Sequence, residues 1–167
     1  MNDTDDKPLW RVLYVHPRSE KKVLLYCGIG NITSYLPLRA ETKVYQRRRV
    51  TVEKPVFPGY IFARLDPDSR LAILKSNLIV RIMDTPDQRL LLHQLAQIRK
   101  ALKANPALVA VPAIVKGIRV RITNGPFLGI EGVVASVKSS GRVALNVDMI
   151  GQAIAVEVEK NFLEILQ

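Results

Sequence analysis

The chain of 167 residues has little of what secreted, membrane or metal-binding proteins need. Its single cysteine, Cys27, excludes an internal disulfide framework and a cysteine-rich zinc site, and indicates a reducing compartment. No apolar run approaches the roughly 20 residues that cross a bilayer. The first residues lack the charged start and hydrophobic run of a signal peptide. We therefore expect a soluble, cytoplasmic protein with no membrane partner.

Acidic residues are also scarce, since 15 Asp and Glu face 25 Lys and Arg, for a formal net charge of +10. The excess is local. Residues 7–104 carry 19 basic and 7 acidic side chains, whereas residues 105–167 carry 6 and 5. Such asymmetry predicts that one half of the chain meets a polyanion, most simply nucleic acid, and that the other half does something else.

Two proline dipeptides suggest where the halves divide. Asn105-Pro106 and Val111-Pro112 interrupt helix continuity, because proline lacks an amide hydrogen and restricts the residue before it. We place a first domain at residues 7–104, a semi-rigid linker at 105–113 and a second domain at 114–167.

The first domain mixes strands with helices. One helix follows Ser19 and ends near Gly28 and Gly30, and a second opens at Asp66-Pro67 with an N-cap and a first-turn proline. Its leucines Leu71, Leu74 and Leu78 fall on one side. A third starts from a capping box of Thr85 and Gln88, and its apolar face is Leu91, Leu95, Ile98 and Leu102. The predicted strands are Trp10–Val15, Ile32–Leu38, Lys43–Glu53, Phe57–Leu65 and Ile79–Met83.

The second domain has an all-β pattern, with glycine or Asn-Gly every several residues. Short strands at regular spacing are typical of a small barrel that closes its own edges. The expected fold class is α+β, an N-terminal α/β sandwich followed by a small five-stranded β-barrel. The five strands are Ile118–Thr123, Gly132–Lys138, Arg142–Asp148, Ala153–Glu159 and Phe162–Leu166.

No constellation of catalytic residues is present. The glycines of Gly28–Thr33 follow a helix and lack the third glycine of a dinucleotide loop. His16 and His93 lie far apart and have no ligand cluster at a known metal spacing. Cys27 falls on an apolar helix face, where a buried structural thiol is favoured over a nucleophile. We expect no enzyme, no metal site and no cofactor.

Two pairs of sequence strings identify a family. The runs WRVLYVHPRSEKKV (Trp10–Val23) and PVFPGYIF (Pro55–Phe62) resemble the N-terminal domain of the NusG transcription factors. The runs GIRVRITNGPFLGIEGVV (Gly117–Val134) and DMIGQAIAVEVE (Asp148–Glu159) are similar to their KOW barrel. Together they cover nearly the whole chain in the family order. The compact linker, the arginine cluster and the Pro-Arg-Ser-Glu-Lys-Lys stretch resemble the specialised RfaH-like and UpxY-type paralogues, which antiterminate capsular polysaccharide operons.

The resemblance implies a monomeric elongation and antitermination factor whose N-terminal domain binds the clamp helices of RNA polymerase and suppresses pausing. Tyr14, Tyr60 and Phe62 match polymerase-contacting positions, with Phe57 expected to pack inside. Strand aromatics are equally ordinary core residues, so each ring keeps that alternative. The family's Thr-rich gate-loop motif is missing after Leu65, and Ser69 and Arg70 are the nearest positional candidates for that contact.

Basic side chains supply candidate nucleic-acid contacts. In the specialised paralogues the positions of His16, Arg18, Lys21 and Lys22 approach the non-template DNA strand, although a solvated helix face explains them as well. Arg47 to Arg49, beside Tyr45, would add a second contact to phosphate of DNA or nascent RNA. Strand alternation turns Arg47 and Arg49 one way and Arg48 the other. Charge that protects an exposed hairpin edge is the competing interpretation.

The barrel is expected to recruit a second protein. The partner face of the family's barrels corresponds here to Phe127, Ile130, Met149, Ile150 and Gln152. Gln152 stands where the housekeeping factor has an arginine, which favours ribosomal protein NusE over termination factor Rho as the partner. The basic charge also fits an alternative function, that of a KOW-containing protein that binds RNA or the ribosome.

Overall fold

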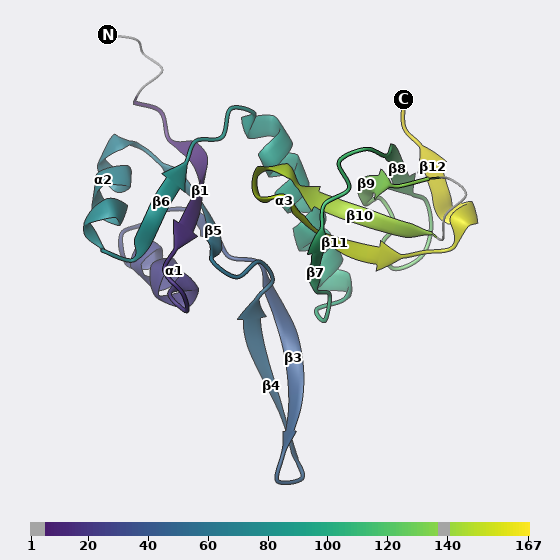
Figure 1. The fold of residues 1–167 in the computed structure, drawn as a ribbon, viewed down its shortest axis with the longest axis horizontal. Helices are drawn as coiled ribbons and strands as arrows, with labels where there is room; N and C mark the ends of the chain where they lie inside the picture. The colour runs from purple at the N-terminus through teal and green to yellow at the C-terminus, as the bar shows by residue number, and fades with distance from the viewer. Residues whose placement is uncertain (1–5, 137–140) are drawn as a thin grey trace. The chain divides into compact units, whose positions relative to one another are not determined.

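The computed structural model describes residues 6–136 and 141–167, and Figure 1 shows their course. Residues 137 and 138, the end of one predicted strand, lie outside the described residues. The described chain forms two compact units, one from residues 6–37 and 57–89 and the other from residues 38–56 and 90–167. Helices and sheets occur in both, and the mixed α+β class is confirmed.

The first unit contains an antiparallel four-stranded sheet in the order β2-β5-β1-β6. Its strands are β1 (Leu9–Val15), β2 (Ser34–Tyr35), β5 (Tyr60–Leu65) and β6 (Ile79–Met83). Helices α1 (Glu20–Ile29) and α2 (Pro67–Lys75) belong to the same unit. Cys27 of α1 is fully buried, and this burial raises the pKa of its thiol.

Helix α2 begins as predicted but buries a different side. The Asp66 carboxylate accepts a hydrogen bond from the Ser69 amide at 2.7 Å, which is the expected N-cap. Leu71 and Leu74, however, are 52% and 47% exposed, and Ile73 is the buried residue. The prediction of a leucine face was therefore wrong, because residue type alone does not say which side of a short helix is covered.

Helix α3 (Gln88–Ala104) buries Leu91, Leu95, Ile98 and Leu102 as predicted. The predicted capping box does not form. The Gln88 amide instead makes two hydrogen bonds of 2.7 Å with the backbone of Trp10, one donated and one accepted, and Thr85 keeps a buried hydroxyl without a partner. The Gln88 side chain also donates to the Thr85 carbonyl at 3.0 Å, so it joins the backbone before α3 to that of β1.

Residues 38–55 form a hairpin rather than the single strand predicted over Lys43–Glu53. Strands β3 (Leu38–Tyr45) and β4 (Arg48–Pro55) pair as a separate two-stranded sheet. Gln46 and Arg47 form the turn with positive φ values of 45° and 66°. Such turns favour glycine or asparagine, and their absence here hid the turn from sequence analysis.

The hairpin belongs to the second unit, whose other sheet has six strands in the order β12-β8-β9-β10-β11-β7. Five correspond to the predicted strands: β8 (Ile118–Ile122), β9 (Glu131–Val134), β10 (Arg142–Val147), β11 (Gln152–Glu157) and β12 (Leu163–Ile165). The sixth, β7 (Ala110–Pro112), pairs with β11 inside the segment predicted as a linker. The segment predicted as a linker thus contributes a strand to the sheet.

The buried residues of this sheet are mostly aliphatic, and two of its strands approach each other closely. Val120, Ile122, Val143 and Leu145 are at most 1% exposed. A Cβ on Gly132 would lie 2.5 Å from a Val143 methyl and 2.7 Å from the Ala144 carbonyl oxygen. Glycine is therefore required where these strands approach each other. Short 3₁₀ turns η1 (Asp148–Ile150) and η2 (Lys160–Phe162) precede β11 and β12.

None of the described helices is long and apolar enough to span a membrane.

Candidate functional site

Two tyrosines form an exposed aromatic pair on the four-stranded sheet. Tyr14 of β1 and Tyr60 of β5 are direct cross-strand partners, with ring centroids 5.3 Å apart and planes inclined by 39°. Tyr14 is 38% exposed, and Tyr60 is partly exposed. Tilted rings at this distance attract each other beyond their burial, so the pair presents one shared apolar surface.

A tight turn fixes this pair. The Tyr60 amide donates to the Phe57 carbonyl at 3.1 Å, which closes a turn around Pro58 and Gly59. Gly59 has φ +91°, and a Cβ there would lie 3.1 Å from the Tyr14 ring. Proline followed by glycine with positive φ is the signature of a type II turn. The Tyr14 ring thus lies directly against a glycine that no other residue can replace without strain.

A buried carboxylate locks the turn from the other side. Glu20, at the start of α1, is 7% exposed and accepts a hydrogen bond from the Gly59 amide at 2.9 Å. Sequence analysis missed this residue. An acid in the first turn of a helix and beside cations is ordinary, so the sequence carries no signal that sets Glu20 apart.

Phe62 does not belong to the exposed surface. It shares the face of Tyr60 but lies two residues further along β5, opposite Val12, and both are 0% exposed. This burial corrects the expectation that the Phe62 ring contacts a partner. Phe57 is 1% exposed and packs inside, as predicted.

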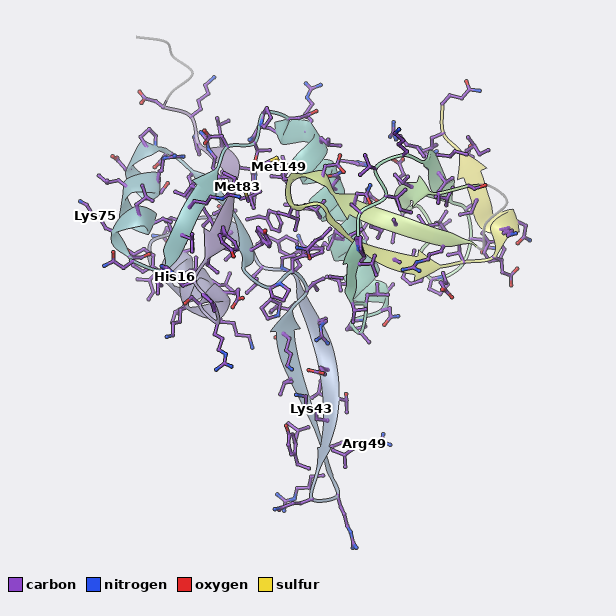
Figure 2. All side chains as sticks on the ribbon, in the orientation of Figure 1. His16, Lys43, Arg49, Lys75, Met83 and Met149 are labelled. Atoms are coloured by element: carbon purple, nitrogen blue, oxygen red, sulfur yellow. The ribbon has the colours of Figure 1, made fainter. Side chains whose placement is uncertain are left out.

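The basic segment that follows β1 is exposed. His16, Arg18, Lys21 and Lys22 all reach the surface, and Figure 2 labels His16. The Ser19 amide donates to the His16 carbonyl at 3.0 Å, and Arg18 adopts φ 61° within this turn. The segment therefore presents its cations from a defined backbone turn at the start of α1.

Ser69 and Arg70 both have structural partners in this unit. The Ser69 hydroxyl accepts a hydrogen bond from the Asp66 amide at 2.8 Å, completing the reciprocal cap of α2. The Ser69 backbone amide donates to the Asp66 carboxylate, and this hydrogen bond lowers the pKa of Asp66. Arg70 pairs with Asp84 at 3.3 Å, and Asp84 also pairs with Arg11. The sequence pattern Asp66-x-x-Ser69 could have revealed the cap.

The hairpin of residues 38–55 has two different faces. Because directly paired residues share a face, one side carries Tyr45 with Arg48, and the other carries Val44 with Arg49. The Thr42 and Thr51 hydroxyls lie 3.1 Å apart, which confirms the pairing on the Val44 side. Figure 2 shows the Arg49 side chain pointing away from the ribbon. Arg47 lies in the turn, so the prediction that Arg47 and Arg49 share a strand face was wrong.

One carboxylate with three cations around it lies on the Tyr45 side of the hairpin. Glu41 is 2.5 Å from the Lys54 ammonium, 3.9 Å from Lys43 and 4.0 Å from Arg39. These cations, Lys54 first, lower the pKa of Glu41. Sequence analysis missed the cluster because it depends on the register of the unpredicted hairpin.

The expected partner face of the six-stranded sheet is only partly exposed. Ile130 is 2% exposed and belongs to the core, which corrects its assignment as a contact residue. Phe127, Met149, Ile150 and Gln152 are half-buried. Met149, labelled in Figure 2, and Ile150 belong to the 3₁₀ turn η1.

Side chains of α3 form hydrogen bonds with the segments that contain Ile130 and Met149. The Gln97 side-chain oxygen accepts a hydrogen bond from the Glu131 backbone amide at 2.9 Å, and the Gln94 side-chain oxygen accepts one from the Asp148 backbone amide at 3.0 Å. The Glu131 carboxylate lies 2.8 Å from Arg121 and 3.4 Å from His93. Arg121 is the main cause of the lowered pKa of Glu131. Glu131 and Asp148, which are adjacent in sequence to Ile130 and Met149, thus form polar contacts with α3.

No group of three or more metal-ligating side chains occurs within residues 6–136 and 141–167. The described surfaces present an aromatic pair, basic segments and a half-buried apolar face.

The family comparison agrees with the two N-terminal sequence strings, which lie within the matched region. The family model described as "Transcription termination factor nusG" matches residues 8–106. A solved structure described as "Domain interaction in Thermotoga maritima NusG" is similar, with 18% identity, a TM-score of 0.48, and coverage of 96% of this chain and 98% of that chain. No curated protein matches significantly. Because the family match spans more than half of the chain, the protein belongs to the NusG family of transcription factors.

Proposed function

We propose that the protein is an elongation and antitermination factor that binds RNA polymerase through its first domain and suppresses pausing and termination. The observation that carries this proposal is the match of residues 8–106 to the NusG family, whose members bind RNA polymerase. Within that region the exposed Tyr14–Tyr60 pair supplies an apolar surface suited to the polymerase clamp helices.

The geometry of the ring pair supports a specific protein contact. Tyrosine is favoured at interfaces because its ring buries a large area at little conformational cost. Here the two rings are packed together before any partner arrives, and the Gly59 turn and Glu20 hold them. A surface formed in advance loses less entropy on binding.

Nucleic acid is the second component of this proposal. His16, Arg18, Lys21 and Lys22 would bind phosphates of the non-template DNA strand through a salt-dependent interaction. Ser69 and Arg70 have structural partners in the free protein, so we leave the gate-loop contact out of the proposed binding surface.

The second domain is proposed to recruit a further protein through Phe127, Met149, Ile150 and Gln152. Ribosomal protein NusE is the favoured partner, and Gln152 in place of an arginine argues against Rho. A partner other than Rho suits an antiterminator of the RfaH or UpxY type, acting at polysaccharide-type operons.

Single-round transcription on a long template tests the proposal. Adding the protein should shorten pauses and increase full-length RNA, and unchanged pausing and termination would refute it. Tyr60→Ala should remove most of the effect with the fold intact. Leu25→Ala, which trims a 65% exposed residue of α1, is the matched control and should behave as the parent protein.

Retention on RNA polymerase distinguishes the alternative, an RNA- or ribosome-binding protein. The proposed factor is retained on a column of RNA-free polymerase, and Tyr60→Ala reduces that retention. A protein that binds naked RNA tightly but passes through the column would favour the alternative.

A further inference from the structure

The two faces of the β3–β4 hairpin differ in charge. The Tyr45 face consists of four cross-strand pairs: Arg39 with Lys54, Glu41 with Val52, Lys43 with Val50, and Tyr45 with Arg48. It carries four basic side chains and one acid. The Val44 face carries one of each, Arg49 and Glu53. The turn adds Arg47 at the end of the hairpin.

Protection of an exposed strand edge does not explain this difference. Charges that only prevent edge-to-edge pairing work from either face of a ribbon, because both strands are edges. Here the basic residues gather on one face, and an aromatic ring stands among them. Their distribution is that of a binding surface.

The acid on this face offsets part of its positive charge. Glu41 contacts Arg39, Lys43 and Lys54, all on its own face. These contacts are confined to the inner part of the face. Arg47 and Arg48, near the turn, form no ion pair with any residue in the part of the chain that the structure describes. The outer part of the face therefore keeps its cations available for an anion.

Tyr45 gives this face an aromatic ring on which a nucleic-acid base can stack. It is 59% exposed, lies directly across from Arg48, and has no ring partner among the described residues. Bases of a single strand stack on such a ring whatever their sequence, whereas bases in a duplex are already stacked. From the Arg39 pair to the Tyr45 pair the face extends about 20 Å, which corresponds to about six nucleotides of a stacked strand.

We propose that the Tyr45 face of the hairpin binds single-stranded nucleic acid, with a base stacked on Tyr45 and the backbone phosphates held by Lys43, Arg47 and Arg48. The inference deepens the proposed function by adding a second nucleic-acid contact, but the binding itself needs no polymerase. The single strand can be RNA or DNA, since both offer a base and a phosphate.

Fluorescence anisotropy with the full-length protein tests the inference directly. The probes are a labelled RNA and a labelled DNA of about 12 nucleotides and a duplex of the same length, titrated between about 50 and about 200 mM salt. Either single strand should bind more tightly than the duplex. Tyr45→Ala should weaken single-strand binding about fivefold or more, with the salt dependence unchanged.

Arg48 and Arg49 form a matched pair, since they are adjacent, identical in chemistry and on opposite faces. Arg48→Gln should weaken binding and reduce the slope of log affinity against log salt by about 0.7. Arg49→Gln should change affinity less than about twofold and leave that slope unchanged. Both positions are exposed, so circular dichroism should show an unchanged fold.

Three results would overturn the inference. Equal losses for Arg48→Gln and Arg49→Gln would indicate total charge without a binding face. Tighter binding to the duplex would contradict the role of Tyr45. Loss of polymerase retention by Arg48→Gln, with oligonucleotide binding intact, would assign the face to an acidic protein surface. In every case Tyr60→Ala and the transcription assay still report separately on the proposed function.

Discussion

Two exposed tyrosines are supported in opposite ways. Tyr14 packs on Tyr60 at 5.3 Å and against Gly59, and a buried carboxylate holds that glycine. Tyr45 stands on an isolated two-stranded hairpin, among lysines and arginines. The first arrangement suits the proposed contact with a protein of matching shape, because the rings have little freedom to adapt. The second suits the proposed contact with nucleic acid, in which charge attracts the strand and the ring stacks on any base. Changes that affect one region and spare the other can test this division.

The largest effect is expected for Gly59→Ala. The new Cβ meets the Tyr14 ring at 3.1 Å, and φ +91° is unfavourable for alanine. The free energy of unfolding should fall by about 2 kcal/mol, measured by urea denaturation. Polymerase retention should fall with it, whereas single-strand binding by the hairpin should not change. Gly28→Ala, with nothing within 4 Å of its Cβ, should instead stabilise α1 by up to about 1 kcal/mol. Equal destabilisation by both would contradict the assigned role of Gly59.

Glu20→Ala should have the next largest effect. It leaves the Gly59 amide without its acceptor, which should cost about 1.5 kcal/mol of unfolding free energy. Polymerase retention should weaken because the turn loosens. Glu20→Gln keeps a side-chain oxygen acceptor and should lose less. If the two variants lose the same stability, the hydrogen bond to Gly59 is not what Glu20 contributes.

Acidic pH should lower the stability of the folded protein modestly. Asp66, Glu41 and Glu131 have lowered pKa values in the folded protein, caused by hydrogen bonds from Ser69, Lys54 and Arg121 respectively. A lowered pKa stabilises the fold above the unfolded value and loses that contribution as the pH falls through the folded one. The melting temperature should therefore be constant from about pH 7 to about pH 5 and decline below about pH 4. A triple variant with Asn or Gln at these positions should decline less.

Glu41→Gln should have the smallest effect on stability. Exposed ion pairs contribute little, so the melting temperature should not change measurably. Single-strand binding should tighten about twofold, because a negative charge leaves the binding face. Weaker binding would instead mean that Glu41 is needed to hold the cations in place.

Local signals predicted well where the partner is near in sequence. The Asp66 cap needs only the next three residues, and the apolar repeat of α3 is long enough to fix its buried face. The strands of the first domain follow from short runs of β-branched and aromatic residues. The turn around Pro58 and Gly59 likewise involves only neighbouring residues.

Predictions were wrong where a distant partner decides. The Gln88 side-chain oxygen accepts from the Trp10 amide and forms no capping box with Thr85, and β7 pairs with β11 although proline ends it. Strand alternation places Phe62 on the same face as Tyr60. It could not show that this face is partly exposed at Tyr60 but fully buried at Phe62, two residues further along β5. The hairpin turn at Gln46 and Arg47 has no local signature, and without it the faces of the arginines cannot be assigned.

Cys27 has a practical consequence. It is the chain's one cysteine and lies on the buried side of α1, fully inaccessible to solvent, and this burial raises the pKa of its thiol. A thiol reagent can reach it only when this part of the protein opens. The labelling rate therefore reports the opening free energy of the α1 region, without any introduced probe. The same helix starts with Glu20, so the natural sequence carries its own sensor for the rigidity of the tyrosine pair.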